Sequence, residues 1–184
     1  MKKSLHHLIA LPLFGLSLLG LSACTVIDEP VDVVKPFELN QYLGTWYEIA
    51  RLDHSFERGM TNVTAQYRID GDKVVVINKG FKQDEQQWDQ AEGKAYFIDG
   101  DDKGLLKVSF FGPFYGAYQI HDIEQNSQGQ YTDSLVIGPN NQYAWILSRS
   151  PILDPVIKQR FINKLAALSI SEGKLIWVQQ GDQQ

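Results

Sequence analysis

The sequence is poor in cysteine and in positive charge. Cysteine occurs once, at Cys24, so no disulfide can form within the chain and packing alone must stabilise the fold. Basic residues number 17 against 22 acidic ones, which gives a formal net charge of −5, and they form no cluster. A chain of this kind is poorly suited to bind nucleic acid, and we expect no nucleic-acid partner.

The motifs of common catalytic and metal sites are also missing. The chain has no Gly-x-Ser-x-Gly, no His-Glu-x-x-His and no phosphate-binding loop. Histidine occurs after the first 23 residues only at His54 and His121. His121 and Asp122 are neighbours in an expected strand, so their side chains point to opposite faces and cannot pair directly. We therefore expect no catalytic residue, no metal site and no cofactor.

A long apolar run occurs at the start of the chain. Lys2 and Lys3 precede an apolar stretch over residues 8–21, and small residues precede Cys24. This order is typical of a secretory signal peptide, here residues 1–23, and the stretch is short for a spanning helix. Leu21-Ser22-Ala23-Cys24 also resembles the lipobox of bacterial lipoproteins. That resemblance implies lipidation of Cys24, which would begin the mature chain and attach it to a membrane.

The residue after Cys24 indicates which membrane. In the sorting pattern of Gram-negative lipoproteins an aspartate at this position retains the protein at the inner membrane, whereas this chain has Thr25. We expect the outer membrane, with the protein facing the periplasm. Residues 24–36 are interpreted as the lipidated N-terminus and a flexible tether, because residues 25–35 show no sustained apolar period. The remaining chain is long enough for one domain with a core.

Short alternating segments separated by turn residues follow from Gly44 onward. Val63, Ala65, Tyr67 and Ile69 share one face of an expected strand, and polar residues occupy the other face. This pattern is typical of an antiparallel barrel or sandwich. The expected strands are residues 45–52, 62–69, 73–78, 88–98, 105–111, 117–124, 131–137 and 143–149.

One helix is expected after these strands. Asp154 can cap it, Pro155 suits its first position, and apolar residues from Ile157 to Leu168 recur at helical spacing. A short ninth strand follows over residues 174–179. We therefore predict an all-β fold, an eight-stranded antiparallel barrel with one C-terminal helix packed outside it.

Three segments of the chain resemble the motifs of the lipocalin family. The run from Gly44 to Arg51 resembles the first lipocalin motif, built on Gly-x-Trp. Residues 134–143 stand where the second motif falls, and Leu147-Ser148-Arg149 matches the arginine motif. The run from Val108 to Gly116 resembles bacterial lipocalins, which are outer-membrane lipoproteins. The resemblance covers residues 37–180, the expected domain, and leaves 181–184 as a tail.

The resemblance implies an up-and-down barrel, or calyx, that is closed at one end. In lipocalins the motif residues are structural, so Gly44, Trp46 and Arg149 should close the bottom of the barrel, with the guanidinium stacked on the tryptophan ring. The implied ligands are fatty acids or lysophospholipids, which the protein would bind, store or transport for membrane maintenance under stress. The resemblance also suggests a homodimer.

Candidate ligand-binding residues come from the expected mouth and lumen. The aromatic run 110–115 is interpreted equally well as part of the mouth or as side chains packed over a bend at Gly112-Pro113. Arg51, Arg58 and Lys107 are possible partners for a carboxylate or phosphate, although a solvated charge is the commoner role. Glu48 shares the parity of Trp46 and should face inward. The candidate ligand-binding residues are Phe56, Tyr67, Phe110, Phe114, Tyr115 and Tyr118.

Two alternatives to a lipid-binding protein stay open. The chain could be an envelope protein with a largely filled barrel whose surface binds a protein partner. A lipid-acting enzyme using His54 or His121 is the less supported alternative.

Overall fold

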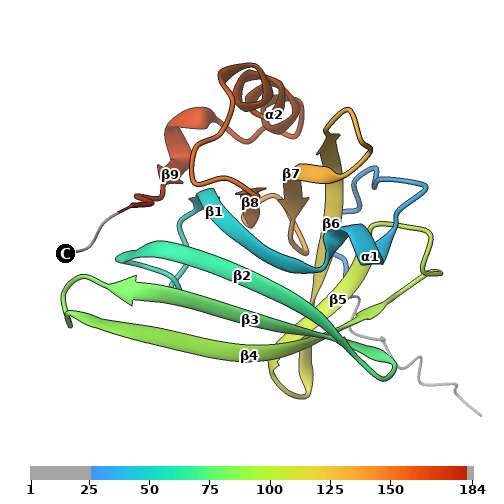
Figure 1. Ribbon diagram of the computed structural model, residues 1–184, viewed down its shortest axis with the longest axis horizontal. Coiled ribbons are helices and arrows are strands. Elements are labelled where there is room, and N and C mark those ends of the chain that lie inside the picture. Colours follow the sequence, from blue (N-terminus) through green and yellow to red (C-terminus); the bar gives the residue numbers. More distant parts are fainter. Residues whose placement is uncertain (1–25, 182–184) are drawn as a thin grey trace, which may run out of the picture.

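The computed structural model describes residues 26–181, which form a closed β-barrel with a helix packed on its outside (Figure 1). Eight strands follow one another around the barrel, each antiparallel to the next, and β8 closes the circle against β1. The ninth strand lies outside this circle and pairs with β1. The predicted fold class is therefore confirmed. The strands are β1 Gly44–Leu52, β2 Met60–Asp70, β3 Lys73–Lys82, β4 Gln87–Phe97, β5 Leu105–Phe111, β6 Phe114–Gln125, β7 Tyr131–Ile137, β8 Ala144–Ser148 and β9 Leu175–Trp177.

The helices flank the eight barrel strands in the sequence. Helix α1 (Leu39–Tyr42) precedes the barrel, α2 (Pro155–Ala167) follows it, and a 3₁₀ turn η1 (Glu172–Lys174) leads into β9. The Asp154 carboxylate caps α2 by accepting a hydrogen bond from the Val156 amide at 2.7 Å. The apolar face of α2 buries Phe161 and Leu165 in a cluster with residues of β7 and β8. This cluster covers the outer face of the barrel wall.

Several strands are longer than the sequence indicates, and β3 and β6 exceed their expected bounds the most. The alternation of β3 weakens at Lys79-Gly80, yet the strand continues to Lys82, which pairs with Gln87 of β4. Strand β6 begins at Phe114, which pairs with Phe111 of β5 across a turn at Gly112-Pro113. The aromatic run 110–115 therefore forms the tip of a hairpin.

The N-terminal segment, residues 26–36, is bound to the barrel wall, whereas the sequence indicates a flexible tether. Its bonds are largely to backbone groups: the Val34 amide donates to the Ile120 carbonyl at 2.9 Å, and the Gly104 amide donates to the Val34 carbonyl at 2.9 Å. The Gln119 side chain accepts from the Val31 amide at 3.0 Å. Composition does not reveal such backbone pairing, which is why the sequence prediction differs here.

The C-terminal residues fill a seam in the barrel. Strand β1 pairs with β2 only over its first half, Gly44–Tyr47, and its second half pairs with β9. Beyond β9, the side-chain amide of Gln180 donates to the carbonyls of Glu48 at 2.8 Å and Val63 at 2.9 Å. Gln180 therefore bridges β1 and β2 where they separate.

Arg149 closes the opposite part of the barrel. Its guanidinium carbon lies 3.8 Å from the centroid of the buried Trp46 ring. The guanidinium also donates to three carbonyls, those of Thr45 (2.7 Å), Leu43 (2.7 Å) and Gln41 (2.9 Å). Gly44 has a φ of +93°, and a Cβ there would lie 3.5 Å from Nη1 of Arg149. Arg149 thus binds the end of β8 to the start of β1 and to α1.

Replacing Arg149 by lysine tests this closure. Arg149→Lys keeps the charge but cannot satisfy three carbonyls while stacking on Trp46, so we expect a loss of about 2–4 kcal/mol in the free energy of unfolding. Urea denaturation measures it, and Arg68→Lys on the exposed face of β2 is the matched control. Equal stability of the two variants would contradict the role given to Arg149.

Replacing Gln180 tests the seam. Gln180→Ala removes two hydrogen bonds to half-buried carbonyls and should lower the free energy of unfolding by about 1–2 kcal/mol. Gln179→Ala, an exposed neighbour in the same segment, should change it by less than about 0.5 kcal/mol. The two denaturation midpoints should therefore separate, and coincident midpoints would show that the side chain of Gln180 does not stabilise the seam.

Candidate functional site

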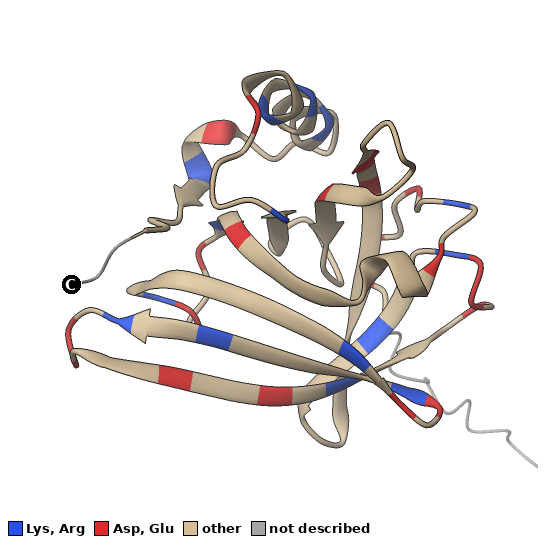
Figure 2. Cartoon of the chain, in the orientation of Figure 1, with Lys and Arg blue, Asp and Glu red and all other residues tan. Residues whose placement is uncertain are grey.

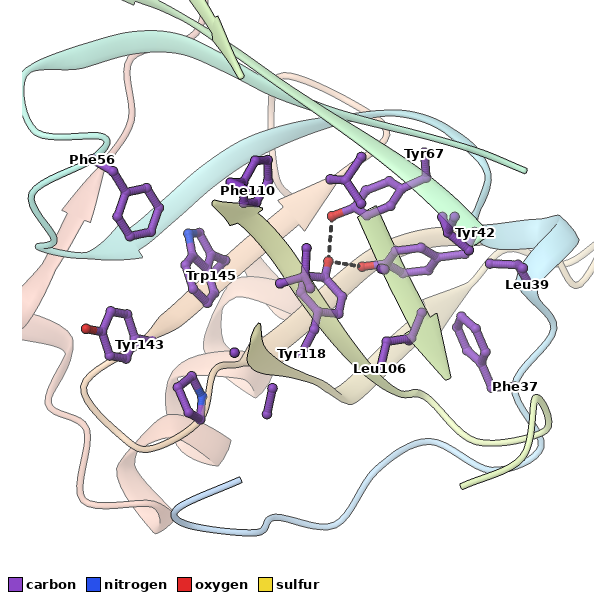
Figure 3. A pocket seen from close by; sticks show the side chains of 17 residues that line it. Phe37, Leu39, Tyr42, Phe56, Tyr67, Leu106, Phe110, Tyr118, Tyr143 and Trp145 are labelled. Carbon is purple, nitrogen blue, oxygen red and sulfur yellow. Dashed lines mark hydrogen bonds between the residues drawn. The ribbon is translucent and has the colours of Figure 1, made fainter. Parts of the chain in front are cut away.

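The barrel encloses an apolar cavity of about 290 Å³ (Figure 3). Small and medium side chains on the inner faces of β3, β4, β5 and β6 leave this space open, because larger ones would fill it. Aromatic side chains complete the wall at both ends. The lining includes Phe37, Tyr42, Phe56, Tyr67, Val74, Val76, Ala95, Leu106, Val108, Phe110, Ala117, Tyr118, Pro139, Tyr143 and Trp145.

Three tyrosines form the floor of the cavity, of which Tyr42 and Tyr67 are buried and Tyr118 is partly buried. The hydroxyl of Tyr118 is hydrogen-bonded to those of Tyr67 at 2.7 Å and Tyr42 at 2.8 Å (Figure 3). Tyr42 is also hydrogen-bonded to Ser134 at 3.2 Å. Burial raises the pKa of Tyr42 to about 12, and it raises the pKa values of Tyr67 and Tyr118 well above their usual value. The floor is therefore neutral, and its hydroxyls are satisfied by one another.

The opposite end of the cavity is its mouth. Phe56 and Tyr143 lie there, on the far side of Trp145 and Phe110 from the tyrosine floor (Figure 3). The Phe56 ring is half exposed and stacks on His54, with 3.8 Å between ring centroids. A ligand that enters between these side chains would place its inner end against the tyrosines.

Phe110 separates the inner cavity from a second, outer cavity of about 290 Å³. Its ring occupies the position that a side chain on Gly93 would need, since a Cβ there would lie 2.8 Å from the ring. The outer cavity has more polar groups than the inner one and includes the exposed Phe111 and Phe114. Phe110 thus lies between two spaces that both adjoin Phe56.

A buried charged cluster supports the loop that carries Phe56. Arg51 donates to the Glu48 carboxylate at 2.7 Å and to the Glu57 carbonyl at 2.6 Å. His54 Nε2 lies 3.0 Å from the Glu57 carboxylate, which also accepts from the Trp145 indole at 3.2 Å. Burial and the neighbouring Glu57 carboxylate raise the pKa of Glu48 well above its usual value. Arg51 therefore pairs with the Glu48 carboxylate alone, whereas the Glu57 carboxylate contacts His54 and Trp145, and burial favours the protonated form of Glu48.

The three cations suggested by the sequence as ligand partners are engaged by protein groups. Arg51 belongs to the buried cluster, and Arg58 pairs with Asp53 at 2.8 Å. Lys107 lies 5.2 Å from the centroid of the Tyr115 ring. The inner cavity consequently depends on apolar contacts rather than on these charges.

Five of the six predicted ligand-binding residues line one of the two cavities. Phe56, Tyr67, Phe110 and Tyr118 line the inner cavity, and Phe114 lines the outer one.

Tyr115 lies apart from the other five candidates. Gly116 lines the inner cavity, so alternation along β6 turns Tyr115 to the outer face, beside Tyr96 at 6.3 Å between centroids.

Several lining residues were not named from the sequence. Val74, Val76 and Ala95 occupy inward positions that alternation along β3 and β4 could have revealed. Trp145 comes from the mouth end of β8, and Tyr143 comes from the turn before that strand. Cys24 lies outside the described residues.

The described part of the chain offers neither a membrane-spanning helix nor a cluster of metal ligands. Within residues 26–181, no helix combines the length and apolar character needed to cross a membrane. Among the same residues, no group of three His, Cys, Asp or Glu side chains is placed to hold a metal ion.

Comparison with known proteins identifies relatives over almost the whole described chain. The model of the lipocalin-like domain matches residues 37–180. The outer membrane lipoprotein Blc of Vibrio cholerae is 47% identical over 161 residues, covering 87% of this chain and 92% of that protein. The Escherichia coli K12 protein of the same name is 46% identical, with 86% and 89% covered. The cockroach allergen Per a 4 shares the fold, with a TM-score of 0.65 at 19% identity over 84% of this chain and 95% of that one.

The raised pKa of Glu48 predicts how stability depends on pH. Between the usual value of 4.5 and the raised value, the folded state holds a proton that the unfolded state has released. Stability should therefore fall as the pH rises through this window. Glu48→Gln cannot titrate and should flatten the profile of unfolding free energy above pH 4.5, whereas the exposed Glu92→Gln should leave it unchanged. An equally steep profile for Glu48→Gln would contradict the assignment.

Proposed function

The chain belongs to the lipocalin family, and on that basis we propose that it is a lipid-binding lipoprotein of the outer membrane that holds an acyl chain inside its barrel. The observation that carries the proposal is the inner cavity, whose wall is almost wholly apolar and whose floor is neutral. Each buried methylene of a ligand contributes about 0.8 kcal/mol. A long acyl chain is the ligand that uses such a wall best.

The ligand's polar end should remain at the mouth. The floor hydroxyls are hydrogen-bonded to one another, so a carboxylate or phosphate placed there would have to break these bonds and lose its water. At the mouth it stays hydrated beside the outer cavity. Fatty acids and lysophospholipids both have this form, one long apolar chain with one polar end, and both are included in the proposal.

The proposed location is the periplasmic face of the outer membrane, through acylation of Cys24. The support is the signal-like order of residues 1–23, the lipobox and Thr25, together with relatives that bear the name outer membrane lipoprotein. Intact-mass measurement of protein purified from membranes tests the acylation and detects a co-purifying lipid in the same sample. A mature chain beginning at an unmodified residue would contradict the anchor.

The physiological role that we infer is the binding and transport of lipids for membrane maintenance under stress, in a protein that also forms a homodimer. Sedimentation of the protein at several concentrations tests the dimer. A barrel filled by side chains, the alternative with a protein partner, is disfavoured by the cavity of about 290 Å³. An enzyme that uses His54 is disfavoured because the ring is buried, stacks on Phe56 and already pairs with the Glu57 carboxylate.

A larger side chain in the inner cavity should weaken the binding of an acyl chain. Ala95 is buried and lines the inner cavity, so Ala95→Phe would occupy the space of two or three methylenes. At about 0.8 kcal/mol each, this weakens the affinity for palmitate about tenfold to fiftyfold. Titration of delipidated protein with palmitate measures the change.

Ala166→Phe adds the same bulk on the exposed side of α2 and is the matched control. Thermal unfolding verifies that both variants are folded. Saturable binding of palmitate by Ala95→Phe with the affinity of the unmodified protein would rule out the inner cavity as the lipid site.

A further inference from the structure

We propose that the open end of the barrel docks directly on the bilayer surface through an aromatic tip, residues 111–114, that inserts among the lipid headgroups. The partner is a zwitterionic phospholipid bilayer. This inference rests on the proposed acylation of Cys24, and it adds an orientation: the mouth of the cavity faces the membrane.

The aromatic tip is an exposed apolar feature at the end of a hairpin. Phe111 is 77% exposed and Phe114 is 79% exposed, and the turn residues between them are exposed as well. No charged residue occurs from Val108 to Ile120, and the tip of the β5–β6 hairpin is tan in Figure 2, the colour of uncharged residues. Two neighbouring phenylalanines left in water mark a surface that contacts an apolar partner.

The tip lies beside the openings of both cavities. Phe111 and Phe114 line the outer cavity, and Phe110, next along the chain, separates it from the inner one. Farther along β6, Gly116 and Ala117 line the inner cavity. A tip inserted in a bilayer would therefore place these openings at the lipid surface, and an acyl chain could enter without crossing water.

The N-terminal segment is attached at the same end of the barrel. The Ala117 amide donates to the Val26 carbonyl at 3.2 Å, and the amides of Asp28 and Glu29 donate to the carbonyl of Pro139, which lines the cavity mouth. Cys24 is only two residues before Val26. At full extension these span about 7 Å, so an acylated Cys24 keeps the membrane close to this end of the barrel.

The charges near the mouth indicate the kind of surface. Asp28 and Glu29 are exposed beside the attachment point, and an anionic bilayer would repel them. The uncharged tip, in contrast, gains from apolar insertion alone. Docking should therefore occur on zwitterionic lipid and should change little with salt concentration.

A fluorescent label at Gly112 tests the orientation. Gly112 is exposed and a side chain there would meet no atom within 4 Å, so Gly112→Cys retains both phenylalanines. Gln128→Cys, exposed in the turn between β6 and β7, is the matched control. Lipidated protein purified from membranes is labelled with a nitrobenzoxadiazole fluorophore and reconstituted into phosphatidylcholine vesicles that contain a nitroxide lipid quencher.

The expected result is a blue-shifted emission and several-fold stronger quenching at position 112 than at 128, because insertion places the label within about 5–10 Å of the headgroup boundary. The shift should disappear when Phe111→Ser and Phe114→Ser are added. It should persist with Ile152→Ser and Val156→Ser, which remove two side chains of similar exposure elsewhere on the surface. Far-UV circular dichroism verifies that each variant is folded.

Other outcomes separate this inference from the function proposed above. If the mass of the sample shows an acylated Cys24 but position 112 is as accessible as 128, the docking surface is refuted while the anchor stands. If the label at 112 shifts in detergent, without vesicles, as the protein concentration rises, a second copy of the chain covers the tip and the inference fails. If Cys24 carries no lipid and 112 still shifts on added vesicles, the tip docks without the anchor.

Discussion

The contact between Arg149 and Trp46 is the constraint on which the cavity depends. An eight-stranded barrel is open at both ends unless something crosses one of them. Here the guanidinium stacks on the indole ring and binds three carbonyls around α1, so the helix is held across the barrel end. Tyr42, the last residue of α1, reaches the cavity floor from this position. The cavity is closed because this one cation satisfies backbone groups at the end of the barrel.

The opposite end is organised by charges that do not line the inner cavity. Arg51 and two glutamates are buried behind the loop that carries Phe56, and they position that loop without offering a free charge to a ligand. A buried ion of this kind is stable only when it is paired and hydrogen-bonded. The barrel therefore has a neutral interior, a rigid support for one side of its mouth, and an uncharged aromatic hairpin on another side.

Much of the fold could be predicted from the sequence because alternation and turn residues are local signals. Val63, Ala65 and Tyr67 show the inward face of β2 directly, and Asp154-Pro155 marks the start of α2. Features that depend on distant backbone groups were hidden: residues 26–34 pair with carbonyls and amides of the barrel, and Gln180 bridges two strands more than a hundred residues earlier. In the site, Phe56, Tyr67, Phe110 and Tyr118 do line the inner cavity, and their role in binding a ligand stays a prediction. Tyr115 lies on the outer face, and its aromatic neighbours conceal the parity that turns it outward.

The seam between β1 and β2 constrains when the barrel can be completed. The strands of the barrel are all synthesised by Ser148, yet the gap beside the second half of β1 is filled by residues 175–181. Contacts between such distant parts of a chain form late, because closing a long loop costs conformational entropy. The barrel therefore cannot be sealed until residues 175–181 have joined the folded strands. The segment that locks the first strand in place is one that follows all eight barrel strands in the sequence.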